Sequence, residues 1–151
     1  MTKLLTQTCA PDSWFDALDD LALACAGAFA EDEGVLLRRF HGLLEHAPSP
    51  ALLAGIAQPD AALFDASVSL GAATSAALSL IGEDAGYMLS RDSSGKHLAS
   101  IILPGHFEEA TVGADTAALA IVGALAVALH DPLPLPADLH DIADRTPVRL
   151  N

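Results

Sequence analysis

An uninterrupted apolar run from Ala117 to Leu129 most constrains what this chain can fold into. A membrane-spanning helix needs about 20 consecutive apolar residues, so this run is too short to cross a bilayer. It is rich in helix-favouring residues and apolar on nearly every side, which is typical of a helix buried all round. The sequence therefore predicts a central core helix, which must be covered either by other segments of the chain or by a second copy.

The N-terminal part, residues 10–58, is predicted to be helical. Pro11-Asp12-Ser13 favours a helix start, and a second helix is predicted from about Glu31 to His46. After the break at residues 48–50, a third, short helix is predicted with Ser49 as its N-cap. Apolar residues recur at broadly helical spacing in the first two helices: Trp14, Phe15, Leu18, Leu21, Leu23 and Phe29, then Val35, Leu36, Phe40, Leu43 and Leu44.

Residues 60–131 are predicted to form an α-β-β-α unit. Its first helix is expected to begin at an N-cap, either Asp60 or Asp65, and to extend to Ile81. Its last helix is expected over 116–130, because Asp115 is placed to accept hydrogen bonds from the free N–H groups of the first turn.

The strands of this unit are predicted from two short runs, 86–91 and 96–103, which flank a polar turn at 92–95. A Gly-containing turn between two such runs is typical of an antiparallel hairpin. Alternation along the first strand places its side chains on opposite faces of the hairpin: Tyr87, Leu89 and Arg91 on one, Met88 and Ser90 on the other.

These elements together predict an α+β fold that is predominantly helical, with an N-terminal helical segment before the α-β-β-α unit. A chain of 151 residues is long enough to bury a substantial core as a single domain, residues 1–151. Residues 1–9 are expected to be either an added strand or a disordered arm. Residues 132–151 are expected to form a Pro-rich linker, a short helix and a tail.

A family resemblance rests on the predicted helix, on the hairpin beginning Tyr87-Met88-Leu89-Ser90-Arg91-Asp92, and on the stretch from Gly113 to Ile121. Together these features resemble the small phage-type "ABA sandwich" proteins and related short bacterial proteins. The resemblance covers the C-terminal half, and the long helical N-terminal segment departs from the family pattern. It implies the α-β-β-α fold and a phage relationship, and it assigns no activity to any residue.

The charge of the chain disfavours nucleic-acid partners, and the lack of an apolar run long enough to span a bilayer disfavours a membrane partner. Twenty Asp and Glu stand against seven Lys and Arg, a formal net charge of −13. Affinity for nucleic acids comes largely from Lys and Arg that neutralise phosphates, and here the cations cluster no further than the Arg38–Arg39 pair. A basic protein partner stays open, because a net negative field steers such partners toward the surface.

The two cysteines, Cys9 and Cys25, form neither a disulfide framework nor a C-x-x-C pair. Cys25 lies in an Ala-rich helical stretch, where a free thiol is expected to be an inert small hydrophobe. The first residues lack the apolar core of a signal peptide. The sequence therefore predicts a protein of the reducing cytoplasm.

One loop is the most site-like cluster of the sequence. His106, Glu108 and Glu109 could direct an imidazole and a carboxylate at one proton or metal ion, although a solvated loop is the favoured interpretation. Ser94-Gly95-Lys96 is interpreted as a hairpin turn, because the remaining residues of a phosphate-binding loop are missing.

His41 and His46 are spaced five apart, which does not suit two ligands on one helix face. No residue is assigned a catalytic, cofactor-binding or metal-binding role, and no cofactor is expected.

Two functions of different class are consistent with these observations. The favoured hypothesis is a non-catalytic protein-binding or assembly module that contacts a protein partner or a second copy of itself. The alternative is a small hydrolase or metal-dependent enzyme that uses the loop of His106, Glu108 and Glu109.

Overall fold

The computed structural model describes residues 11–130; the predictions for residues 1–9 and 132–151 lie outside this part of the chain. It contains helices α1 (Pro11–Gly27), α2 (Glu33–Glu45), α3 (Ala61–Ser69), α4 (Ala73–Leu78) and α5 (Ala117–His130), strands β1 (Gly86–Arg91), β2 (His97–Ile102) and β3 (Ala110–Ala114), and 3-10 helices η1 (Ala30–Asp32) and η2 (Pro50–Leu53). The predicted α+β, predominantly helical fold class is confirmed.

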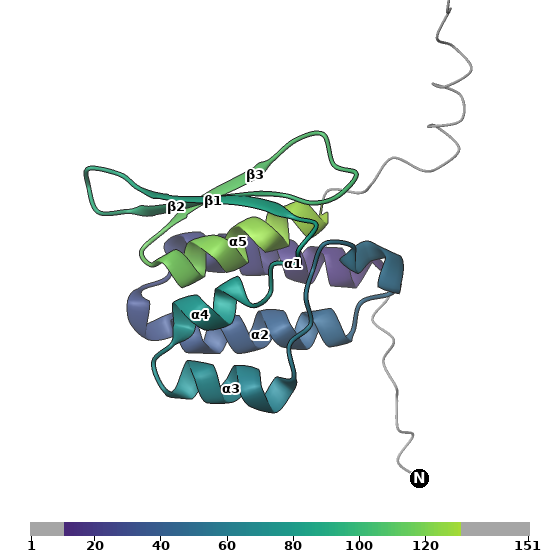
Figure 1. Cartoon of the computed structure of the whole chain (residues 1–151), viewed down its shortest axis with the longest axis horizontal. Coiled ribbons are helices and arrows are strands. Elements are labelled where there is room, and N and C mark those ends of the chain that lie inside the picture. Colours follow the sequence, from purple (N-terminus) through teal and green to yellow (C-terminus); the bar gives the residue numbers. More distant parts are fainter. Residues whose placement is uncertain (1–10, 131–151) are drawn as a thin grey trace, which may run out of the picture.

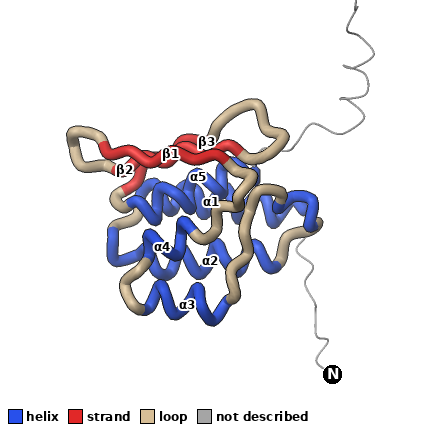
Figure 2. The backbone as a smooth tube through the Cα atoms, in the orientation of Figure 1, coloured by secondary structure: helices blue, strands red, loops and turns tan. Residues whose placement is uncertain are grey.

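The elements are stacked in layers. Figure 1 shows the sheet at the top, α5 and α1 beneath it, and α2, α4 and α3 farther below. Figure 2 shows the same arrangement by element type, with all strands on one side of the helices. One face of the sheet is therefore covered by helices, and no helix of the described part covers the other face.

The sheet is antiparallel with the strand order β1-β2-β3. The predicted hairpin is confirmed: β1 pairs with β2 from Gly86↔Ile102 to Arg91↔His97. The third strand, β3, is a correction to the predicted two-stranded unit, in which the second strand is followed only by a loop before the last helix. It pairs with β2 from Ile101↔Ala110 to His97↔Ala114, so the unit is α-β-β-β-α.

Helix α5 is the centre of the core, as the apolar run predicted. All of its residues from Ala118 to Ala126 are buried, and it packs against α1, α2, α4, β2 and β3. The sequence allowed this helix to be covered either by other segments of the chain or by a second copy. Among the described residues, other segments of the chain cover it. At Gly123 an added Cβ would lie 2.8 Å from Val112 Cγ1, so the glycine lets β3 approach the helix closely.

The single helix predicted from Asp60 to Ile81 is divided in two. Asp60 does cap α3, since its Oδ1 accepts hydrogen bonds from the N–H groups of Ala62 and Leu63. The chain then turns at Gly71, which has φ +80°, and α4 begins at Ala73. A positive φ ends an α-helix, and glycine adopts it without steric cost.

The start of α5 also differs from the prediction. Thr116 Oγ1, rather than Asp115, accepts the hydrogen bond from the N–H of Leu119 (3.2 Å). Asp115 Oδ2 instead accepts from the N–H of Ala30 at the turn between α1 and α2 (3.1 Å). The cap prediction for Asp115 was wrong because a tertiary partner takes its carboxylate.

One other local prediction, the N-cap at Ser49, is confirmed. Ser49 Oγ accepts from the N–H of Ala51 at the start of η2. The Nδ1–H of His46 donates to the carbonyl of Gly42 at the end of α2 (2.8 Å). Within residues 11–130, none of the helices combines the length and the apolar character needed to span a membrane.

Candidate functional site

The loop between β2 and β3 contains the predicted cluster of His106, Glu108 and Glu109. These side chains line a hollow of about 250 Å³, and the end of α5 contributes Val127, Ala128 and His130 to its wall. Sequence reasoning missed this second histidine, because His130 is distant along the chain from the loop. His130 lines this hollow because α5 packs beneath the sheet.

His130 is held in place by the start of α1. Its Nδ1–H donates to the carbonyl of Phe15 (3.2 Å), and the two rings meet edge to face with centroids 5.9 Å apart. A neutral imidazole with this tautomer leaves Nε2 as an acceptor. Among residues 11–130, however, no group of three or more His, Cys, Asp or Glu side chains lies close enough to hold a metal ion.

The segment Ser94-Gly95-Lys96 is the hairpin turn that the sequence predicted. Asp92 Oδ1 accepts hydrogen bonds from the N–H groups of Ser94 and Lys96 and from the Ser94 hydroxyl, and Gly95 has φ +90°. These hydrogen bonds lower the pKa of Asp92 below its usual 3.8, and the bond from the Ser94 hydroxyl has the largest effect. The polar groups of this turn are used in closing the hairpin.

His41, which the sequence did not favour as a ligand, has a structural role. Its ring stacks on Phe64 with centroids 4.7 Å apart, and its Nε2–H donates to the carbonyl of Pro59 (2.9 Å). The ring thereby connects α2 to the segment that enters α3. His46 lies exposed at the end of α2, so the two histidines do not face one site.

Cys25 is buried where α1, α5 and β3 meet, and the pKa of its thiol is raised to about 12 by burial, against a weaker lowering by Arg39. The thiolate is the nucleophilic form of cysteine. Its suppression here agrees with the inert role predicted for Cys25.

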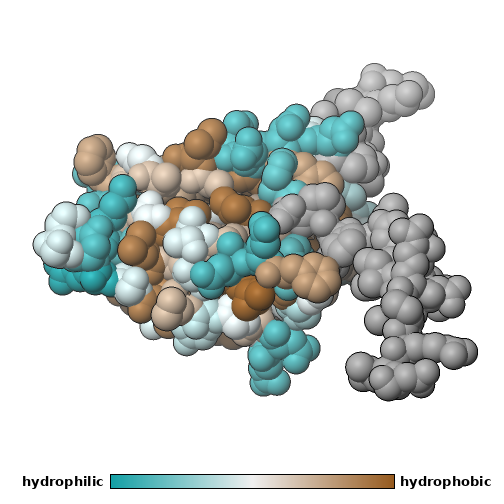
Figure 3. Space-filling view, turned by 90° about the horizontal axis from the view of Figure 1, so that it is seen from above, coloured by the Kyte–Doolittle hydropathy of each residue, from teal (hydrophilic) through white to brown (hydrophobic). Residues whose placement is uncertain are grey.

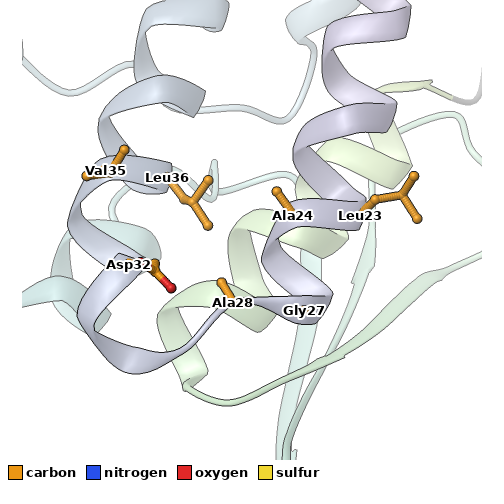
Figure 4. A pocket seen from close by; sticks show the side chains of 7 residues that line it. All are labelled: Leu23, Ala24, Gly27, Ala28, Asp32, Val35 and Leu36. Carbon is orange, nitrogen blue, oxygen red and sulfur yellow. The ribbon is translucent and has the colours of Figure 1, made fainter.

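An open apolar groove runs between the end of α1 and the start of α2. It is lined by Leu23, Ala24, Gly27, Ala28, Asp32, Val35 and Leu36. Figure 4 shows Ala24 and Leu36 facing each other between the helices, with Leu23 and Val35 on the outer sides. Leu23 and Val35 are 69% and 68% exposed, so these members of the predicted apolar helix faces lie outside the core.

The outer face of the sheet is a second exposed surface of unusual composition. Strand alternation and register place one set of side chains away from the helices: Met88, Ser90, Leu98, Ser100, Ile102 and Thr111, with Gly86 and Gly113. None of them is charged. Figure 3 looks down on the molecule from the side of the sheet and shows pale and brown residues between teal groups.

The details of this outer face follow from the pairing. Met88 is 62% exposed and Ile102 is 39% exposed, while the hydroxyls of Ser100 and Thr111 hydrogen-bond to each other across β2 and β3 (2.8 Å). The stem of Lys96 lies beside Gly113 at the turn end. The predicted division of β1 is confirmed, because Leu89 lies opposite buried Ala99 on the helix side.

Comparison of the chain with protein-family models, with curated proteins and with solved structures found no match. The resemblance to the "ABA sandwich" proteins therefore stays a prediction, and the inference of function depends on the surfaces described above.

Proposed function

We propose that this protein is a non-catalytic protein-binding or assembly module, and that its contact surface is the outer face and open edge of the sheet. The observation that supports this most strongly is an exposed, uncharged sheet face on a chain with a net charge of −13. An antiparallel sheet with one face in water normally places polar residues there. Here the exposed apolar side chains Met88 and Ile102 lie among uncharged polar ones, and exposed apolar groups gathered on one face mark sites of contact with other proteins.

The chemistry of the face suits a protein partner better than a polyanion. Met88, Leu98 and Ile102 supply apolar contact area, whereas the phosphates of nucleic acids require cationic side chains. A partner with an apolar patch and a basic surround would gain from both the face and the negative field of the chain.

The proposed setting is the reducing cytoplasm, supported by the unpaired, buried Cys25. A phage relationship belongs to the proposal as well, supported by the resemblance of the C-terminal half to the phage-type family.

Affinity capture with matched variants tests the proposal. The double variant Met88→Glu/Ile102→Glu adds charge to the outer face, and Leu63→Glu adds charge to α3 at a side chain of similar exposure, 70% against 62% for Met88. Captured proteins are compared by quantitative mass spectrometry. We expect the wild type and Leu63→Glu to retain the same protein partner, and the double variant to lose it. Failure of the wild type to retain any protein, including a second copy, would contradict the proposal.

An enzyme centred on the loop of His106, Glu108 and Glu109 is the second candidate, favoured by the unexpected presence of His130 in the same hollow. A hydrolase screen of the purified protein, with metal analysis, tests it. Activity that is lost in both His106→Ala and His130→Ala would support the enzyme and displace the binding module. Equal turnover in the wild type and both variants, or none, would end this alternative.

A further inference from the structure

Strand β1 lies at an open edge of the sheet and has exposed side chains on both of its faces, with Leu89 half-buried on the helix side. The strand order leaves one side of β1 without a partner among residues 11–130. Helix α5 packs on β2 and β3, whereas Tyr87 and Met88, on opposite faces of β1, are 55% and 62% exposed. Unpaired N–H and C=O groups along such an edge are a template for another strand.

The hydrogen bonds of the hairpin show which backbone groups face this edge. The N–H of Asp92 donates to the carbonyl of Lys96 (2.9 Å), so Asp92 points its backbone groups toward β2. The direction alternates along an antiparallel strand. The backbone groups of Gly86, Met88 and Ser90 therefore pair with β2, and those of 87, 89 and 91 point to the open edge.

Natural edge strands usually carry features that block pairing, such as proline, a bulge, or charges that point inward. Strand β1 contains no proline, and its register with β2 runs without interruption from Gly86 to Arg91. Its single charged residue, Arg91, lies at the last position of the strand. The edge is therefore left competent for pairing along its length.

The side chains of β1 are complementary to their own copy. We propose that two copies pair antiparallel through β1, with Leu89 opposite Leu89 of the second copy, so that one sheet runs through both. In this register Tyr87 lies opposite Arg91 on the helix side, an aromatic–cation pair, and Met88 lies opposite Ser90 on the outer side. Every edge-facing N–H and C=O of residues 87, 89 and 91 then finds a partner, in both copies.

This inference rests on the proposed function and names a second copy as the partner. A twofold axis perpendicular to the sheet keeps the same face outward in both copies, which requires paired residues to lie on the same face. The Leu89-centred register satisfies this condition. Because Asp84 and Asp92 flank β1 and the chain is acidic overall, repulsion opposes association, and added salt should strengthen it.

Charge exchange between positions 87 and 91 tests the register. Tyr87→Lys places a Lys opposite Arg91 twice in each dimer. Because like charges directly opposite each other repel, we expect the dissociation constant of the dimer to rise roughly tenfold. Adding Arg91→Glu creates two Lys–Glu pairs across the interface and should restore association. Within one chain these two positions are too far apart to pair, since a strand rises about 3.3 Å per residue. Leu63→Lys is the control, because it adds the same charge at an exposed position of α3, away from the edge of β1.

Size exclusion with light scattering measures the mass of the full chain at roughly 5–100 µM, concentrations at which weak dimers form and dissociate. Circular dichroism confirms that each variant is folded. We expect the wild type to approach twice the chain mass of 15.5 kDa, more so at higher salt. A wild type that stays monomeric overturns the inference, and so does a double variant no better than Tyr87→Lys, or a Tyr87→Lys that matches Leu63→Lys. A monomer that still captures a face-dependent partner leaves the proposed function intact.

Discussion

Two glycines inside helices, Gly42 in α2 and Gly123 in α5, should respond in opposite ways to replacement by alanine. Alanine is more favourable than glycine in a helix interior by about 1 kcal/mol. At Gly42 an added Cβ meets no atom within 4 Å outside its own helix, so Gly42→Ala should stabilise the protein by about that amount.

At Gly123 the same methyl group meets a tightly packed region. The added Cβ would lie 2.8 Å from Val112 Cγ1 and 3.3 Å from Cys25 Cβ, and the former distance is too short for two carbon atoms. Overpacking of a core costs about 1–3 kcal/mol, which offsets or exceeds the helix gain. Gly123→Ala should therefore be between neutral and about 2 kcal/mol less stable than the wild type, and about 1–3 kcal/mol less stable than Gly42→Ala.

Urea unfolding measures both variants. Trp14 is the single tryptophan and is fully buried, so its fluorescence reports loss of the core, and circular dichroism reports the helices. Val112→Ala should relieve the overlap, so that the two substitutions couple favourably in a double-mutant cycle. An increase in stability for Gly123→Ala equal to that of Gly42→Ala would refute the close approach of β3 to α5.

Three further results are expected. Thr116→Val should cost about 0.5–2 kcal/mol, because it removes the N-cap of α5 and the hydrogen bond that the Thr116 hydroxyl donates to Glu33 (2.8 Å), and Asp115→Ala should cost less; equal losses in urea unfolding would contradict this assignment of the cap. In a Cys9→Ser background, Cys25 should react with iodoacetamide at least about 1,000-fold more slowly in the folded than in the unfolded chain. The free energy of unfolding of the same variant should fall as the pH rises above 9.0, because there only the thiol of the unfolded chain ionises. Asp92→Ala should reduce stability most above pH 3.8, because the lowered pKa favours the folded state only while the carboxylate is charged; a loss that persists unchanged at lower pH would contradict it.

Local chemistry made part of the fold predictable. The caps at Ser49 and Asp60, and the turn at Gly95, depend on groups within a few residues of one another. A hydroxyl or carboxylate close in sequence to free N–H groups has few competing partners. Where a distant partner competed, as Ala30 does for Asp115, the local prediction was wrong.

Strand β3 was missed because its composition is atypical of strands. The segment Ala-Thr-Val-Gly-Ala contains small residues that are depleted in sheets, and it follows a charged loop. Its identity as a strand comes from pairing with β2, and Gly123 of α5 makes the room that Val112 needs. Both contacts are tertiary, and neither has a local pattern.

The division of α3 from α4 was missed for a related reason. Few large apolar residues lie between Leu70 and Leu78, so periodicity could not distinguish a continuous helix from a broken one. The break is seen only in the positive φ of Gly71 and in the hydrogen bond from the N–H of Ala72 to the carbonyl of Ser67. Likewise, His106 and His130 line one hollow because β3 packs against α5.

The complete burial of α5 bears on how two copies would associate. Had this helix needed a second copy for cover, separate chains would be unfolded, as in obligate dimers. Here α1, α2, α4 and the sheet already enclose it, so each chain has its own core before any pairing. Pairing through β1 would add hydrogen bonds at an edge away from that core. Substitutions at Tyr87 should therefore change association while leaving the helices intact, which separates the contact surface of this protein from the residues that fold it.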